Sequence, residues 1–374
     1  MDWFNVDRAG LQAILQRKGK EFAVFELLSN AWDSGATNVA VTLKPIAGRP
    51  AATLVVEDDS VVGWTDLDHA FTLFAPSSRG SKAEKRGRFN LGEKLVLAIC
   101  SEATIETMAG TIRFDVTGRW PRPSRKLERG TKFTAEVRMT REEIETALEA
   151  VSNAITPGAV RTVVNGIALY RPARLNTFTA KLPTEIADAD GNLRRTAREC
   201  VVEVFDGPGQ ILEMGIPVCD AEFPWRLNVT QKIPLNMERD SVTNAFRKAL
   251  TVAAVNAMAE TIQADDATKP WVQESIGDSR CQAPAVQHVI RQQFGDRAVV
   301  AVPGDPIANA RAEAAGYTVV HGGALSADVW ANVRKAAIMP TTASVFPTPR
   351  AVDAAATADA MKDVCPLCGA KATT

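Results

Sequence analysis

The chain has 374 residues, with 43 Lys and Arg against 44 Asp and Glu, so its formal net charge is −1. This balance excludes the global basic excess that drives non-specific nucleic-acid binding, and no apolar run reaches the about 18 residues that a membrane span needs. Hydrophobic residues make up 46%, enough for a full core, and the length predicts two or three domains. Six scattered Cys and an N-terminus without an apolar leader favour a reducing, cytoplasmic location.

Hydrophobic periodicity predicts mixed helices and strands in the first part of the chain. The expected elements are helix within 8–33, strands at 38–45 and 52–57, a polar loop over 75–92, a helix at 93–100, strands at 103–107, 111–117 and 131–138, and a helix at 140–155. Thr140, with Glu143 three residues later, is the pattern of a capping box.

Two further parts follow. The second is expected to hold strands at 159–164, 167–170, 198–205 and 210–218 and an Ala-rich helical run over 241–264. The third is expected to hold helix 284–294, strand 297–302, helix 306–315, strand 317–320 and helix 326–337. A linker-like tail then ends in Cys365-Pro-Leu-Cys368.

Three polar residues of the first helix share one face. Glu26, Asn30 and Asp33 follow i,i+4 and i,i+3 spacing in the segment FELLSNAWDSGAT. Taken alone, the spacing also fits a solvated amphipathic face. The segment LVVEDDSVVGW (54–64) then runs from an apolar strand into adjacent acids, which are costly at a buried strand end unless paired or liganding. Further on, GRFNLGEK (87–94) opens a helix after a Gly-bounded turn, where free N–H groups favour an anion.

Together with RGTKF (129–133), these segments occur in the order of the GHKL ATPase boxes, and the chain resembles that superfamily of gyrase B, Hsp90, histidine kinases and MutL. ELLSNAWDSGAT is similar to the E-x-x-x-N-x-x-D helix, DSVVGW to the D-x-G-x-G loop and GRFNLGEK to the G-x-F-G-x-G lid. Val61 and Asn90 stand where the family has Gly. Asn tolerates a left-handed backbone better than a β-branched Val does.

The resemblance implies ATP and Mg²⁺ as cofactors. It implies Glu26 as the general base, Asn30 as the Mg²⁺ ligand, Asp33 as a supporting group and Asp59 as the acceptor for the adenine amine. Asp58 is the alternative if the register shifts by one residue. The other implied nucleotide contacts are Gly63, Ser81, Lys82, Gly87, Asn90, Leu91, Gly92, Lys94 and Thr131.

The second part is similar to the middle or transducer domains of this superfamily. KIPLNMERDS (232–241) resembles the Hsp90 loop whose Arg reaches the γ-phosphate, which implies Arg239, with Lys232 as the competitor by analogy with gyrase and MutL. The implied fold class is α+β: a Bergerat-type ATP-binding α/β sandwich (1–140), a transducer-like, S5-like α/β domain (141–270), a small α/β extension (280–345) and a flexible tail (346–374).

The expected function is slow Mg²⁺-dependent ATP hydrolysis that drives a clamp or an ATP-dependent homodimer acting on an unidentified client. The alternative is a nucleotide-sensing module with little hydrolysis. Basic clusters at 79–88 and 117–132 leave DNA open as a partner, and they equally fit a lid and a solvated loop. Cys365 and Cys368 are half of a zinc knuckle, and a second chain would have to supply the other two ligands. The chain also resembles small phage-encoded relatives, including lysis-inhibition accessory (RIIA-like) proteins.

Overall fold

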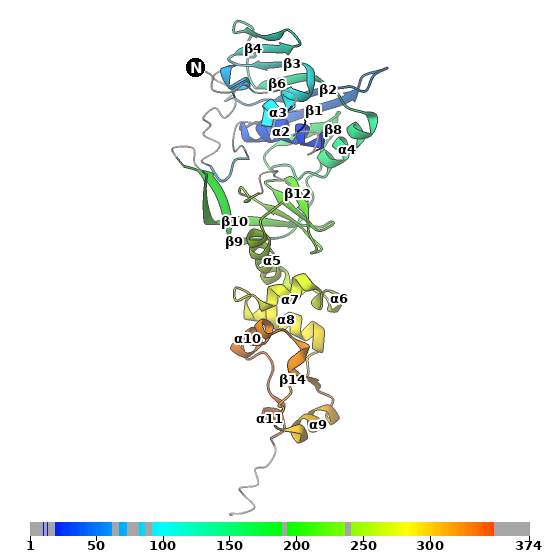
Figure 1. Ribbon diagram of the computed structural model, residues 1–374, viewed down its shortest axis with the longest axis vertical. Coiled ribbons are helices and arrows are strands. Elements are labelled where there is room, and N and C mark those ends of the chain that lie inside the picture. The colour runs from blue at the N-terminus through cyan, green and yellow to red at the C-terminus, as the bar shows by residue number, and fades with distance from the viewer. Residues whose placement is uncertain are drawn as a thin grey trace, which may run out of the picture. The chain divides into compact units, whose positions relative to one another are not determined.

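The computed structural model describes residues 10, 13, 19–61, 67–72, 82–86, 92–188, 193–235 and 241–347 (Figure 1). The chain forms two compact units, Met1–Leu250 and Thr251–Thr374. The fold is mixed α+β, as expected. Among the described residues, none of the helices combines the length and the apolarity that crossing a lipid bilayer requires.

An eight-stranded sheet organises the first half of unit 1, in the order β5-β4-β3-β6-β2-β1-β7-β8. Its strands are β1 (Asn38–Pro45), β2 (Ala52–Asp58), β3 (Cys100–Thr107), β4 (Gly110–Asp115), β5 (Gly118–Arg122), β6 (Thr131–Val137), β7 (Arg161–Val164) and β8 (Ile167–Ala168). Neighbouring strands are antiparallel except β1 and β7, which pair in parallel. We expected the first domain to end near residue 140, but β7 and β8 extend the sheet beyond it.

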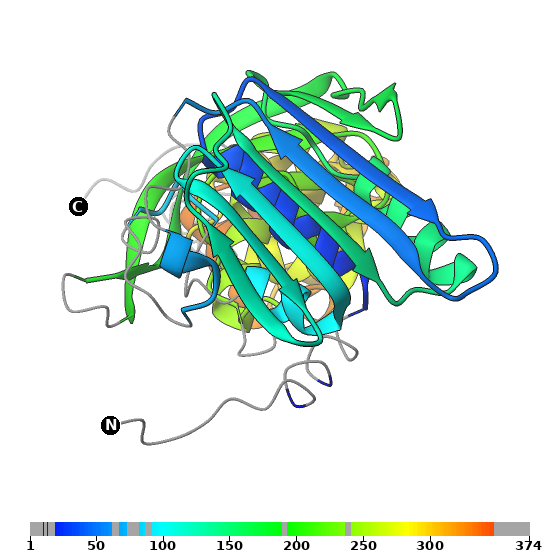
Figure 2. The same ribbon diagram turned by 90° about the horizontal axis from the view of Figure 1, so that it is seen from above.

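Helices α2 (Glu21–Asp33), α3 (Gly92–Ile99) and α4 (Arg141–Ser152) lie behind the sheet in Figure 2. Helix α2 buries a stripe at helical spacing, which includes Val24, Leu28 and Trp32. The strands alternate, so that β1 buries every second residue toward this layer. The predicted capping box of α4 is confirmed, because Thr140 Oγ1 accepts from Glu143 N and the Glu143 carboxylate accepts from Thr140 N.

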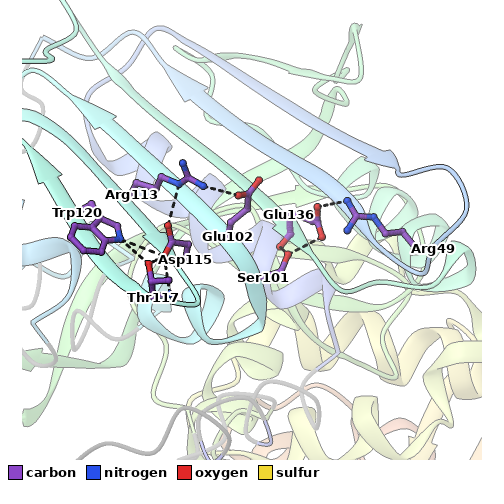
Figure 3. A network of polar contacts seen from close by, with 8 residues as sticks. All are labelled: Arg49, Ser101, Glu102, Arg113, Asp115, Thr117, Trp120 and Glu136. Carbon is purple, nitrogen blue, oxygen red and sulfur yellow. Dashed lines mark hydrogen bonds and ion pairs between the residues drawn. The ribbon is translucent and has the colours of Figure 1, made fainter.

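The opposite face of the sheet carries paired charges (Figure 3). Arg113 pairs with Glu102 and with Asp115, and Arg49 pairs with Glu136. Such pairs are typical of a solvated sheet face. The helix-covered face is therefore the one where apolar burial concentrates.

A second, five-stranded sheet completes unit 1, in the order β12-β11-β13-β10-β9. Its strands are β9 (Arg174–Ala187), β10 (Leu193–Phe205), β11 (Gln210–Glu213), β12 (Ile216–Asp220) and β13 (Arg226–Val229), and helix α5 (Asn244–Met258) follows. Strands β11 and β13 are parallel, and the other pairs are antiparallel. The backbone turns from β11 to β12 through Met214 and Gly215, both with positive φ.

Unit 2 is mainly helical. Its elements are η2 (Ala259–Thr261), α6 (Ala264–Ala267), α7 (Pro270–Gly277), α8 (Ala283–Phe294), β14 (Ala298–Val300), α9 (Pro306–Ala314), β15 (Thr318–Val320), η3 (Gly322–Ala324), α10 (Ala327–Lys335) and α11 (Thr342–Val345). Strands β14 and β15 pair in parallel on either side of α9 in the sequence. The predicted order of elements over 284–337 is confirmed.

Candidate functional site

Helix α2 presents the three polar residues singled out in the sequence. Glu26 and Asn30 are half-buried, and Asp33, one turn after Asn30, is 7% exposed. The apolar stripe of α2 packs into the core of the first unit and so fixes the face on which these residues lie.

Glu26 lies against the beginning of α3. A Cβ at Gly92 would collide with the Glu26 carboxylate, so any other residue there would displace that carboxylate. The first turn of a helix carries unsatisfied N–H groups and the positive end of the helix dipole, both of which favour a carboxylate or a phosphate. Lys94, predicted to contact the nucleotide, is buried in the same helix.

Asp58 lies at the end of β2 on the helix-covered face. Side chains alternate along a strand, and Leu54 and Val56 are buried on that face, so Asp58 shares it. Its carboxylate accepts from Ser60 N at 2.9 Å and from Ser34 Oγ, just after α2, at 3.4 Å. Asp58 is paired across the ladder with Thr131, one of the residues predicted to contact the nucleotide.

Asp59 has different surroundings. Its Oδ1 accepts from Thr37 N at 2.7 Å and Asn38 N at 2.9 Å, and its Oδ2 accepts from Thr37 Oγ1 at 2.8 Å and Asn38 Nδ2 at 2.9 Å. These hydrogen bonds, that from the Asn38 side chain above all, hold the pKa of Asp59 well below its usual range. The carboxylate of Asp59 is thus engaged by Thr37 and Asn38 and also pairs with Arg129 at 3.3 Å, whereas that of Asp58 lies on the helix-covered face of the sheet.

Asp33 is held by Arg86. The Asp33 carboxylate accepts from Arg86 N at 2.6 Å and from Arg86 Nη1 at 2.7 Å. Arg86 Nε also donates to Met214 O at 3.1 Å, and its guanidinium lies 5.0 Å from the centre of the Trp32 ring. Burial lowers the pKa of Arg86, and the Asp33 charge opposes that shift. No feature of the sequence signals this pair, because Arg86 lies in the long polar loop.

The second sheet contributes Lys232, which is 1% exposed. Lys232 N donates to Ala83 O at 2.8 Å, so the loop after β13 contacts the described part of the predicted lid. Lys82, at the start of that part, is exposed.

Several predicted residues lie outside the described residues, and their roles remain predictions. They are Gly63, Ser81, Gly87, Asn90, Leu91, Arg239, Cys365 and Cys368. Val61, which replaces a family glycine, is described: it does not adopt a positive φ, and its side chain is 71% exposed.

Two features bear on whether this site fits a nucleotide. Ser60, adjacent to the two acids, is 1% exposed, and its hydroxyl finds no hydrogen-bond partner in the part of the chain that is described. Gly92 leaves the start of α3 without a side chain beside Glu26. A buried hydroxyl without a hydrogen-bond partner among the described residues and the N-terminal turn of a helix suit a polar, anionic ligand. Within the described ranges, no group of three or more His, Cys, Asp or Glu is arranged to hold a metal ion.

Part of the chain is similar to a known protein family. Residues 18–135 match the family model described as histidine kinase-, DNA gyrase B- and HSP90-like ATPase. Similar solved structures include the ATPase region of Saccharomyces cerevisiae topoisomerase II bound to ICRF-187, at 12% identity and a TM-score of 0.41, covering 61% of this chain and 79% of that one. Another is a second crystal structure of the ATPase region of Saccharomyces cerevisiae topoisomerase II, at 12% identity and a TM-score of 0.39, covering 61% of this chain and 78% of that one. No curated protein matches the chain. The matched segment spans α2, β2, α3 and the start of β6, so this part of the chain is similar to the GHKL ATPases.

Proposed function

We propose that the chain is a Mg²⁺-dependent ATPase that binds ATP on the helix-covered face of its first sheet, between α2, the end of β2 and the start of α3. The observation that carries this proposal is the position of Glu26 against Gly92, because it brings the candidate base to the helix start that suits a phosphate. The family match over residues 18–135 supports ATP as the ligand.

Asp58 is our choice for the acceptor of the adenine amino group, in place of Asp59. Asp58 lies on the same face as the buried side chains of β2 and is paired with Thr131, whereas Asp59 is committed to Thr37 and Asn38. A carboxylate at that position accepts from an exocyclic amine and gives adenine selectivity. The Ser60 hydroxyl, buried beside it, supplies a further polar group toward the base.

Glu26 is the proposed general base. A carboxylate can orient a water molecule and take its proton as the water attacks the γ-phosphorus. Asn30, one turn further along α2, offers an amide oxygen to Mg²⁺, a hard cation that is usually held by a few protein oxygens together with phosphates and water. When bound, Mg²⁺ would neutralise part of the phosphate charge. The first turn of α3 would hold the phosphates beside Glu26.

Lys232 is the proposed cation from the second domain. Its backbone N–H bonds the described part of the lid, so its loop lies within reach of the first domain. A cation at the γ-phosphate stabilises charge that develops during phosphoryl transfer. Arg239, in the segment that resembles the Hsp90 loop, is the competing candidate.

The useful work of this ATPase is proposed to be conformational: ATP draws the lid and the second domain onto the nucleotide, two copies associate, and hydrolysis releases them. Light scattering in ATP, ADP and no nucleotide tests this step, with a doubled mass expected in ATP alone. We propose a protein client. Half of the six basic residues of the segment 117–132 are paired with acids: Arg125 with Glu106, Arg129 with Asp59 and Lys132 with Glu57. For that reason we do not propose DNA.

A nucleotide-sensing module is the second candidate. The observation that favours it is the hydrogen bonding of the Asp33 carboxylate. Both of its oxygens accept from Arg86, which directs them away from a Mg²⁺-bound water.

Replacing Glu26 separates the two candidates. The change Glu26→Gln keeps the size of the side chain and removes the base. An ATPase would lose at least 100-fold in kcat while its Kd for ATP stays within threefold. Glu21→Gln, on the first turn of the same helix, is the matched control and should leave both values within twofold. Wild-type protein that binds ATP without turnover would instead establish the sensing module.

A further inference from the structure

Residues 82–86, which we call the strap, are bonded on two sides. Toward α2, Lys85 Nζ donates to Asp33 O at 2.6 Å, and Arg86 bonds both oxygens of the Asp33 carboxylate. Toward the second sheet, Ala83 O accepts from Lys232 N at 2.8 Å, and Glu84 pairs with Arg198 at 3.2 Å. Four consecutive residues thus contact elements that are distant in sequence.

Arg86 is the member of the strap that contacts both sides with one side chain. Its Nη1 donates to Asp33, while Nε and Nη2 donate to Met214 O. Arg86 is 9% exposed and Asp33 is 7% exposed, so both charges are largely removed from water. A planar guanidinium can donate in two directions at once, which a lysine ammonium cannot do in the same geometry.

The acceptor on the second sheet is part of a firmly held turn. Met214 N donates to Val229 O at 2.8 Å, and Gly215 N donates to Asn228 Oδ1 at 2.6 Å. Asn228 Nδ2 in turn donates to Glu203 Oε2 at 2.8 Å. A displacement of β11–β13 would therefore carry the Met214 carbonyl with it.

On the other side, Asp33 belongs to the last turn of α2. It lies three residues after Asn30 and seven after Glu26, on the same helical face. A pull on Asp33 consequently acts on the helix that carries the proposed base and the proposed Mg²⁺ ligand.

We propose that Arg86 is a positioning residue that links the Met214–Gly215 turn of the second sheet to the catalytic face of α2, so that movement of the second sheet sets the position of Glu26 and Asn30. The link itself is a property of the fold, and its effect on turnover rests on the ATPase function proposed above.

The test combines hydrogen exchange without nucleotide and kinetics with ATP. Arg86→Lys keeps the positive charge beside Asp33 but removes the second set of donors. Amide exchange in peptides covering 27–34 and 210–217 should accelerate at least tenfold, and kcat should fall at least tenfold with KM for ATP within threefold. Arg125→Lys, at the exposed pair with Glu106, is the matched control and should change none of these values.

A double-mutant cycle distinguishes a link from two local effects. Asn228→Ala removes the hydrogen bond that holds Gly215 and should accelerate exchange in 27–34 at least threefold in the wild-type background. In the Arg86→Lys background it should add less than 1.5-fold, because the link is already broken. An equal effect of Asn228→Ala in both backgrounds, or Arg86→Lys exchange within twofold of wild type, would overturn the proposal. Wild-type protein without turnover would refute the ATPase function and leave the exchange results to decide on the link.

Discussion

The two adjacent acids at the end of β2 are predicted to have separable roles, one in nucleotide binding and one in stability. Replacing Asp58 with Ala removes an acceptor proposed for the adenine amine. A hydrogen bond to a charged group is worth about 1.5–3 kcal/mol, so the Kd for ATP should rise about 10- to 150-fold. The melting temperature should change little, since Asp58 accepts one hydrogen bond of normal length, from Ser60 N, and a long one from Ser34.

Replacing Asp59 with Ala should have the opposite effect. It removes the acceptor of four hydrogen bonds from Thr37 and Asn38. Both donor residues are exposed and can turn to water, so no buried donor is left unpaired and the loss should be about 2 kcal/mol, the order of a hydrogen bond to a charged group. For a domain of this size that corresponds to a fall in Tm of about 4–8 °C. The Kd for ATP should stay within threefold.

The pH dependence of the same variant provides a second check. Because the pKa of Asp59 is lower in the folded chain than in the unfolded one, its contribution is present above the unfolded pKa and is lost as the pH falls. The difference in urea midpoint between wild type and Asp59→Ala should therefore be largest at neutral pH and shrink below about pH 4. The opposite result would be that Asp59→Ala abolishes ATP binding at unchanged Tm while Asp58→Ala binds ATP normally. It would refute Asp58 as the acceptor of the adenine amine and favour Asp59, the residue that the spacing of the family loop implies.

Two further changes test other parts of the site. Gly92→Ala places a Cβ into the Glu26 carboxylate and should lower kcat at least tenfold in a phosphate-release assay. Gly158→Ala is the control, because a Cβ there meets open space, and it should leave kcat unchanged. Equal rates for the two variants would refute the contact between Glu26 and the start of α3. Lys232→Met keeps the size of the side chain but removes its charge, and it should lower kcat at least 100-fold with the Kd for ATP within fivefold. The kcat of Arg239→Ala should stay within threefold of wild type. The reverse result would assign the γ-phosphate contact to Arg239.

Local patterns predicted most elements of the fold, and two of the strands they missed, β5 and β9, share a physical cause. Strand β5 contains Pro121 and β9 contains Pro183, which argue against a strand when the sequence is considered alone. Both are edge strands of their sheets, where a missing N–H donor is tolerated. Periodicity cannot tell an edge from a centre, because that depends on pairing between distant segments.

The site shows the same division between local and tertiary information. Glu26, Asn30 and Asp33 were recognisable from helical spacing, since that spacing is local. The alternation of Leu54 and Val56 places Asp58 on their face, whereas the glycine spacing of the family loop points to Asp59 as the adenine acceptor. The partners of Arg86 lie 53 and 128 residues away, and no local pattern encodes such contacts.

The most direct test of the central claim is a hydrogen-exchange footprint of the wild-type chain with and without a non-hydrolysable ATP analogue and Mg²⁺. If the nucleotide binds where we propose, peptides covering residues 26–34, 56–60, 92–96 and 131–133 become protected. Peptides from the opposite, charge-paired face, such as 111–120, remain unchanged. An absence of protection, or protection confined to that opposite face or to unit 2, would contradict the account.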